Sequence, residues 1–221
     1  MRIAHASDLH GWFQILDSVT LVPDVWIFTG DFFPNRTRGN YGIEVLYQTQ
    51  WYASFARDLV ALLRGAPVLL VPGNHDYADL AALLRRDGVD AREVTPHGAV
   101  FQGLRFSGFG HIPLICGEWN REASHRELCD LTLTTFQSDP DVLLTHAPPD
   151  GILNGQYNGI GAVTSALAYQ KHKVRLHLFG HSHEDGGKFA QHMGVLFVNS
   201  ATTVQVVNLP TDAPAVEQGA P

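Results

Sequence analysis

The sequence contains little cysteine. Only Cys116 and Cys129 occur among its 221 residues, and they are not spaced as a Cys-x-x-Cys motif. A disulfide-stapled domain needs several paired cysteines, and a zinc ribbon needs closely spaced ones. The sequence therefore argues against both classes of protein.

Long apolar runs are missing as well. No stretch of the sequence reaches the about 18 apolar residues that predict a membrane-spanning helix. The first residues lead directly into a strand pattern, without the apolar segment of a secretory signal. We therefore expect a soluble, cytoplasmic protein.

The chain also lacks an excess of positive charge. It contains 15 Lys and Arg against 22 Asp and Glu, which gives a formal net charge of −7. Surfaces that bind extended nucleic acids are usually basic, so such a partner is disfavoured. A small nucleotide is compatible with this charge, because bound metal ions would supply positive charge of their own.

The size and composition fit one globular domain. Apolar residues make up 45% of the chain, an ordinary fraction for a globular protein. A chain of 221 residues suffices for one sizeable core and is short for two. We predict one domain over residues 1–209. Residues 210–221 are rich in proline, alanine and small residues, and we expect them to form a disordered tail.

The first half of the sequence alternates between strand and helix patterns. Short apolar runs bounded by Gly or Pro predict buried strands, and apolar residues spaced mostly by three or four predict helices. The predicted strands are residues 2–6, 24–29 and 67–71, and the predicted helices are 43–64 and 77–86. This order is typical of right-handed crossovers and a largely parallel sheet.

The second half contains shorter strand candidates and two further helices. The strand candidates are residues 99–101, 104–109, 142–145, 175–179, 195–199 and 203–208, and the helix candidates are 122–136 and 160–172. Residues 34–41 and 113–120 are predicted loops. This set fits an α/β protein with two facing sheets and helices outside them.

Polar side chains that suit divalent metal ions follow several of the predicted strands. They occur in five blocks: Asp8 and His10 in Ser7-Asp8-Leu9-His10-Gly11, Asp31 in Gly30-Asp31, Asn74 in Gly73-Asn74-His75-Asp76, His146 in Thr145-His146-Ala147, and His181 and His183 in Gly180-His181-Ser182-His183. In open α/β sheets, ligands gather outside the carboxyl ends of the strands. The five loops are therefore expected to converge on one site.

The order of these blocks resembles that of the calcineurin-like metallophosphoesterase superfamily. Its motifs run D-x-H, GD, GNH-D/E, a lone His and GH-x-H, and all five occur here in that order between residues 7 and 183. One such block alone arises often by chance, so the resemblance depends on the whole series. It implies a four-layer α/β/β/α sandwich of two mixed sheets flanked by helices.

The resemblance also implies two divalent metal ions. One ion would bind Asp8, His10, Asp31 and His183, and the other would bind Asp31, Asn74, His146 and His181. Two ions about 3.5–4 Å apart lower the pKa of a bound water, and the resulting hydroxide would attack phosphorus. Manganese is the expected ion, and iron or zinc are the alternatives. The oxygen and nitrogen ligands themselves do not decide among these metals.

His75 is the predicted catalytic residue. By resemblance, it would assist the leaving group of the ester without binding a metal ion itself. The phosphoprotein phosphatases of this superfamily continue the second block to an Asp-Arg pair, whose Asp orients this histidine and whose Arg binds phosphate. Those two positions hold Pro34 and Asn35 here. Asp76 is then the candidate for orienting His75.

Two further stretches favour one branch of the superfamily. Residues 145–149 (THAPP) and 180–187 (GHSHEDGG) resemble the small phosphodiesterases that include cyclic-nucleotide hydrolases. We therefore predict a two-metal phosphodiesterase for small or cyclic nucleotide-type substrates. A phosphomonoesterase or nuclease with the same site is the alternative among enzymes. A non-catalytic metal-binding scaffold is the alternative of another class.

Overall fold

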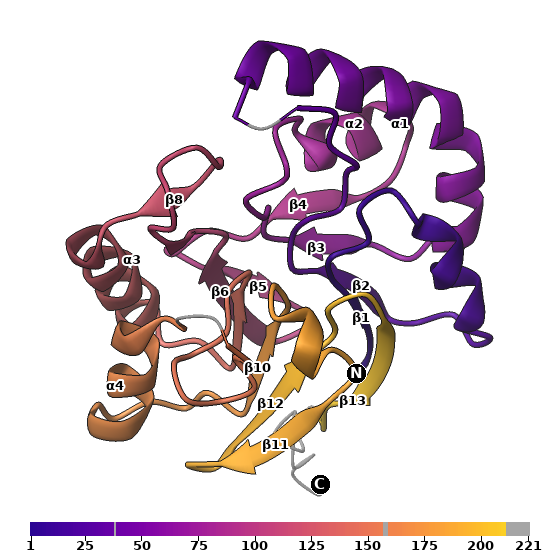
Figure 1. The fold of residues 1–221 in the computed structure, drawn as a ribbon. Coiled ribbons are helices and arrows are strands. Elements are labelled where there is room, and N and C mark those ends of the chain that lie inside the picture. The colour runs from indigo at the N-terminus through magenta and orange to yellow at the C-terminus, as the bar shows by residue number, and fades with distance from the viewer. Residues whose placement is uncertain (38, 157–158, 211–221) are drawn as a thin grey trace, which may run out of the picture.

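The structure is a computed structural model that describes residues 1–37, 39–156 and 159–210. In this part of the chain, the strands form two large mixed sheets, and helices cover the outer face of each sheet (Figure 1). This is the α/β four-layer sandwich that the family resemblance implies. The predicted fold class is therefore confirmed.

The first sheet has five strands in the order β13-β1-β2-β3-β4. They are β1 (Arg2–Ala6), β2 (Val25–Phe28), β3 (Val68–Leu70), β4 (Ala91–Glu93) and β13 (Val204–Asn208). Strands β1 to β4 are parallel, and β13 pairs with β1 in the antiparallel direction. The carboxyl ends of β1, β2 and β3 therefore lie at the same edge of the sheet.

The second sheet has six strands in the order β11-β12-β10-β9-β6-β5. They are β5 (Ala99–Phe101), β6 (Leu104–Phe109), β9 (Val142–Thr145), β10 (Leu176–Phe179), β11 (Phe189–His192) and β12 (Val195–Asn199). The four inner strands are parallel, and the two edge strands are antiparallel. A small separate sheet pairs β7 (Ile112–Pro113) with β8 (Glu122–Ala123).

The helices lie on the two outer faces. They are η1 (Phe13–Ser18), α1 (Tyr41–Leu63), α2 (Leu80–Arg86), α3 (His125–Gln137), α4 (Gly161–Tyr169) and the short η2 (His183–Asp185). In Figure 1, α1 and α2 cover the first sheet, and α3 and α4 cover the second. Three apolar cores follow from this layering, one under each pair of helices and one between the sheets.

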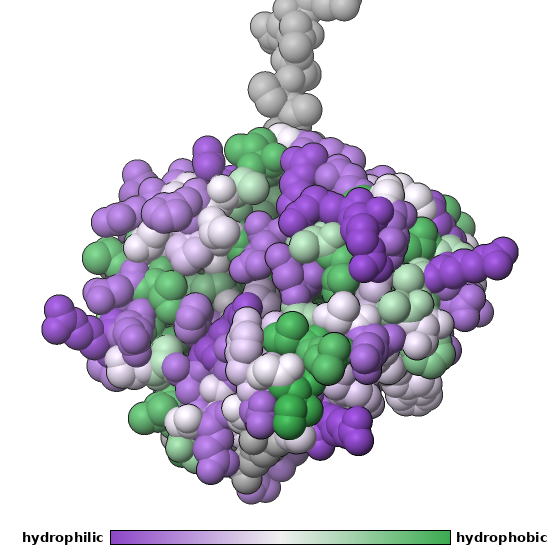
Figure 2. Space-filling model, turned by 90° about the horizontal axis from the view of Figure 1, so that it is seen from above, coloured by the Kyte–Doolittle hydropathy of each residue, from purple (hydrophilic) through white to green (hydrophobic). Residues whose placement is uncertain are grey.

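The inner strands are apolar on both faces because both faces are covered. In β2, Val25 and Ile27 lie in the core between the sheets, whereas Trp26 and Phe28 lie in the core under α1. Alternate residues of a strand point to opposite faces, so one apolar run supplies two cores. The surface seen from above is mainly hydrophilic, with its hydrophobic residues in small separate groups (Figure 2).

Two helices begin later than the sequence pattern predicts. The helix predicted at 77–86 begins at Leu80, because Asp79 accepts a hydrogen bond of 2.8 Å from a backbone N–H of the first turn and so forms the N-cap. The helix predicted at 122–136 begins at His125, because the residues before it pair as β8. Strands β4, β7, β8 and β11 were not predicted at all.

The domain and location predictions stay predictions. One domain over residues 1–209 is not tested by the sheet order, and the predicted disordered tail lies, from residue 211 onward, outside the described residues. The cytoplasmic location is likewise untested. Within the described ranges, every helix is too short or too polar for a membrane crossing.

Two of the fully buried histidines, His5 and His177, are not among the predicted metal ligands. His5 Nε2 lies 2.8 Å from Thr29 Oγ1, and His177 Nε2 lies 2.8 Å from Thr145 Oγ1. Burial lowers the pKa of each imidazole to about 3. The folded protein therefore contains both rings in the neutral form, whereas the unfolded chain protonates them near pH 6.5.

This difference predicts a stability loss in mild acid. Because the folded pKa lies below the unfolded one, the stabilisation is complete above about pH 6.5 and declines as the pH falls towards 3. His177→Gln is expected to remove about 2 kcal/mol of the decline between pH 7 and pH 5. Urea unfolding of chelated protein at both pH values measures it, with His192→Gln, on exposed β11, as the control. If His177→Gln lost as much unfolding free energy between pH 7 and pH 5 as the unsubstituted protein, His177 would not be a source of the acid sensitivity.

Candidate metal centre

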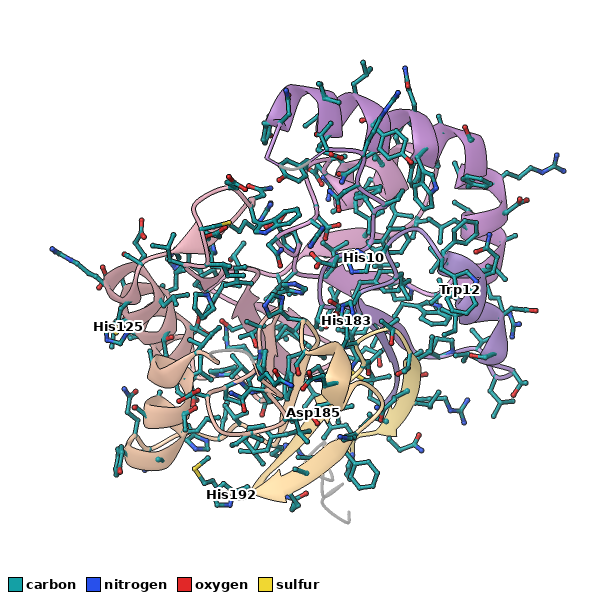
Figure 3. All side chains as sticks on the ribbon, in the orientation of Figure 1. His10, Trp12, His125, His183, Asp185 and His192 are labelled. Carbon is teal, nitrogen blue, oxygen red and sulfur yellow. The ribbon has the colours of Figure 1, made fainter. Side chains whose placement is uncertain are left out.

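The seven predicted metal ligands come together where the two sheets meet. Five of them follow strand ends: Asp8 after β1, Asp31 after β2, Asn74 after β3, His146 after β9 and His181 after β10. In Figure 3, His10 and His183 lie at this junction, whereas His125 and His192 lie at the periphery of the molecule. The site thus takes side chains from both sheets, as expected for ligands at strand ends.

Two carboxylates contact histidines within the site. Asp8 Oδ1 lies 3.2 Å from His183 Nε2, and Asp31 Oδ2 lies 3.3 Å from His146 Nε2. Asp31 Oδ2 also lies 4.0 Å from His10 Nε2. Asp31 Oδ2 lies 3.9 Å from His75 Nε2 as well, so this one carboxylate is close to three imidazoles.

The side chains form three overlapping groups whose potential ligand atoms lie within 4.8 Å of one another. The groups are Asp8, His10 and His183; His10, Asp31 and His75; and Asp31, His146 and His181. Mixed carboxylate and imidazole donors at this spacing suit divalent metal ions. His75 is also close enough to bind a metal ion, so geometry alone does not separate its predicted role from a ligand role.

The surroundings of His146 show that the site fits a cation. Its Nδ1–H donates to Thr29 O at 2.7 Å, so the neutral ring directs the Nε2 lone pair inward. That nitrogen lies 3.0 Å from Asn74 Oδ1 and faces Asp31. Burial alone would lower the pKa of His146, but the Asp31 carboxylate raises the pKa to about 9. A proton or a metal ion is what stabilises such facing acceptors.

Four of the predicted ligands have a left-handed backbone. The φ angles are 55° for Asp8, 45° for His10, 53° for Asp31 and 65° for His181. Residues other than glycine rarely adopt this region, and such conformations are concentrated at functional sites. Backbone hydrogen bonds stabilise them: Asp8 N donates to Gly30 O, and His10 N donates to Asp31 O, each at 2.9 Å.

The prediction that Asp76 orients His75 is wrong. The buried Asp76 carboxylate accepts from Phe32 N at 2.8 Å, Phe33 N at 3.1 Å and Gly73 N at 2.9 Å. Asp76 therefore joins the loops after β2 and β3 and does not contact the imidazole. The ring of His75 bonds to another residue, Asn35, which the sequence did not single out as its partner.

A cavity of about 360 Å³ opens over the site. Besides predicted ligands, its lining includes His75, Ile115 and Trp119. The Trp119 ring lies 4.3 Å from the His75 ring between centroids. An aromatic residue in a loop carries no sequence signal that it lines a pocket, so the place of Trp119 beside His75 is known only from the fold.

A larger cavity, of about 630 Å³, lies elsewhere, beside α3 and the β7–β8 pair. Its lining includes His111 and Arg121 but none of the predicted metal ligands. Volume therefore does not identify the site of chemistry in this molecule, whereas the convergence of acids and histidines does.

Comparison with known families gives one result. The family model described as calcineurin-like phosphoesterase matches residues 1–185, which include all seven predicted ligands and His75. No curated protein matches the sequence.

Proposed function

This chain belongs to the calcineurin-like phosphoesterase family and is a metal-dependent phosphoester hydrolase, and we propose that its substrates are small phosphodiesters of the nucleotide type, including cyclic ones. The observation that carries the proposal is the wall formed by Ile115 and Trp119 next to His75. An indole ring there can pack against a planar organic group of the substrate. Inorganic phosphate has no planar organic group that could pack against this wall.

The seven predicted ligands would hold two divalent ions, manganese first, and Asp31 would serve both of them. When bound, such ions neutralise phosphate charge and lower the pKa of water. The ligand side chains are oriented by hydrogen bonds to the atoms that do not face the site. For example, Asp8 Oδ2 accepts from Ser7 Oγ at 2.6 Å and from His181 N at 2.8 Å.

His75 supplies the proton for the leaving group in this mechanism. The P–O bond to the leaving group breaks, and a P–O bond to the oxygen of water forms. One proton passes from His75 Nε2 to the leaving oxygen, and one proton of the water restores the histidine through solvent. The ring can do this because His75 lines the cavity while its Nδ1 bonds to Asn35.

The loop after Asp31 favours a diester over a monoester. A monoester carries more negative charge at neutral pH and is commonly bound by a bidentate arginine. Arg36 is exposed at its side chain, and its backbone N–H donates to Glu44 at 3.0 Å. Among the described residues, those that line the cavity include no arginine. The site would therefore compensate the single negative charge of a diester better than the larger charge of a monoester.

The first test compares two substrates. Manganese-loaded protein is assayed with bis-p-nitrophenyl phosphate and p-nitrophenyl phosphate, beside a chelated sample. Chelator-sensitive turnover that favours the diester supports the proposal, and cyclic nucleotides are then assayed. A preference for the monoester contradicts the substrate class, and bound metal without turnover on either ester supports a scaffold instead.

His75→Ala separates a proton donor from a metal ligand. We expect turnover to fall roughly 10²–10⁴-fold, while the bound metal, measured by elemental analysis after desalting, stays unchanged. The loss should be larger for esters with poor leaving groups, which need the proton more. His192→Ala, at an exposed position of β11, is the control. Loss of metal in His75→Ala would mean that His75 is a ligand.

A further inference from the structure

Asn35 contacts His75 at two points. The Nδ1–H of the ring donates to Asn35 Oδ1 at 2.5 Å, and Asn35 Nδ2 donates to His75 O at 3.0 Å. The second bond decides which end of the amide faces the ring, because a carbonyl oxygen accepts only from the NH₂ group. The amide therefore determines both the orientation of the imidazole and which of its nitrogens faces the cavity.

Behind Asn35 lies the fully buried side chain of Glu44, in the first turn of α1. Its carboxylate accepts from Arg36 N at 3.0 Å, from Thr37 Oγ1 at 2.8 Å and from Thr37 N. Asn35 Nδ2 lies 3.5 Å from the same carboxylate. Glu44 thus stabilises the loop that presents Asn35, and every group facing it in these contacts is a donor.

Gln48 follows Glu44 by one helical turn on the same face of α1. Its side chain is fully buried, and its Nε2 donates to His75 O at 2.7 Å. Its Oε1 accepts from Tyr77 N at 2.8 Å and from Ala78 N at 2.9 Å. One helix face therefore positions the Asn35 loop and the backbone of His75 together.

We propose that Asn35 is the positioning residue for His75 and that an amide is required there because Glu44 lies behind it. The inference rests on the proposed role of His75 in proton transfer. An aspartate at position 35 would still accept from the ring, but it would place a second carboxylate against Glu44. His75 O would keep Gln48 as its donor, so repulsion by Glu44 is the larger obstacle.

Three variants test the two halves of the proposal. Asn35→Ala is expected to lower kcat on the order of 10²-fold, with KM and bound metal little changed, because the ring loses its orientation and not its substrate contacts. Asn35→Asp should lose a similar factor. Asn35→Asp combined with Glu44→Gln should recover most of it. Asn208→Ala, exposed on β13, is the control.

The outcomes decide each half. Full turnover in Asn35→Ala would overturn the positioning role. Full turnover in Asn35→Asp, or no recovery in the double variant, would overturn the role of Glu44. If His75→Ala itself has full turnover, the proposed role of His75 in proton transfer fails instead, so the two failures are distinguishable.

Two readouts separate positioning from general structural support. In a His75→Ala background, Asn35→Ala should cost almost nothing further, because both changes act through one group. An additional loss of comparable size would show that Asn35 acts elsewhere. In metal-free protein, the Nδ1 proton of His75 should give a downfield NMR signal that both alanine variants remove. Its persistence in Asn35→Ala would also overturn the proposal.

Discussion

Replacing Asp31 with asparagine is expected to lower phosphoester hydrolysis on the order of 10³-fold or more and to reduce the metal content of the protein. Asp31 Oδ2 lies between His146 at 3.3 Å and His10 at 4.0 Å, and Oδ1 accepts from His75 N at 2.7 Å. An amide keeps one oxygen but directs an NH₂ group at part of this set. Because the amide is neutral, it would also offset the repulsion between two bound dications less than a carboxylate does.

Elemental analysis and turnover measure this effect in parallel. The matched control is Asp17→Asn, because the Asp17 side chain is 72% exposed and lies outside the site. Metal affinity should fall for both proposed ions if Asp31 is shared. Loss of a single ion would mean that Asp31 serves only one of them, and normal metal content with normal turnover would remove it from the set of ligands.

Gly180→Ala is expected to have the second large effect. Gly180 follows β10 in the second sheet, and a methyl group there would lie under 3.0 Å from Ser7 Oγ and Asp8 Oδ2, which follow β1 in the first sheet. The two strand ends would have to move apart. We expect a loss of about 3 kcal/mol in the free energy of unfolding and at least a 10²-fold loss of turnover, since Asp8 is displaced.

Denaturant unfolding of the metal-free protein isolates the packing effect from the loss of metal. Gly161→Ala is the control, because a methyl group at that first residue of α4 meets nothing within 4 Å. It should leave stability unchanged or raise it by up to about 1 kcal/mol. Equal stabilities of the two alanine variants would show that the sheets tolerate the separation.

The sequence predicts the central strands well for a physical reason. Strands covered on both faces are mostly apolar, so β1, β2, β3, β9 and β10 appear as short, mainly apolar runs. Strands β4 and β11 were missed because they carry exposed polar residues, such as Glu93 and His192. Their pairing depends on neighbouring strands that are distant in sequence.

The candidate site divides in the same way. The predicted ligands follow strand ends, so their convergence follows from the order of elements. The contact between His75 and Asn35 does not follow from that order, because the two residues are 40 positions apart in the sequence. Glu44 and Gln48 have the spacing of any polar pair on a solvent-exposed helix face, so the sequence does not mark them either. That these two polar side chains are buried is a consequence of tertiary packing, which no local pattern encodes.

The pairing of β1 with β13 has a consequence for the biosynthesis of the protein. Arg2 lies opposite Asn208, and the amino group of Met1 donates to Leu209 O at 2.8 Å. During translation, β1 is made before β13, so one edge of β1 lacks a strand partner until residues 204–208 have been made. Contacts this distant in sequence slow folding, and an unpaired strand edge invites association with other chains. A chain that ends before β13 is therefore expected to leave this edge of β1 unpaired and open to association with other chains.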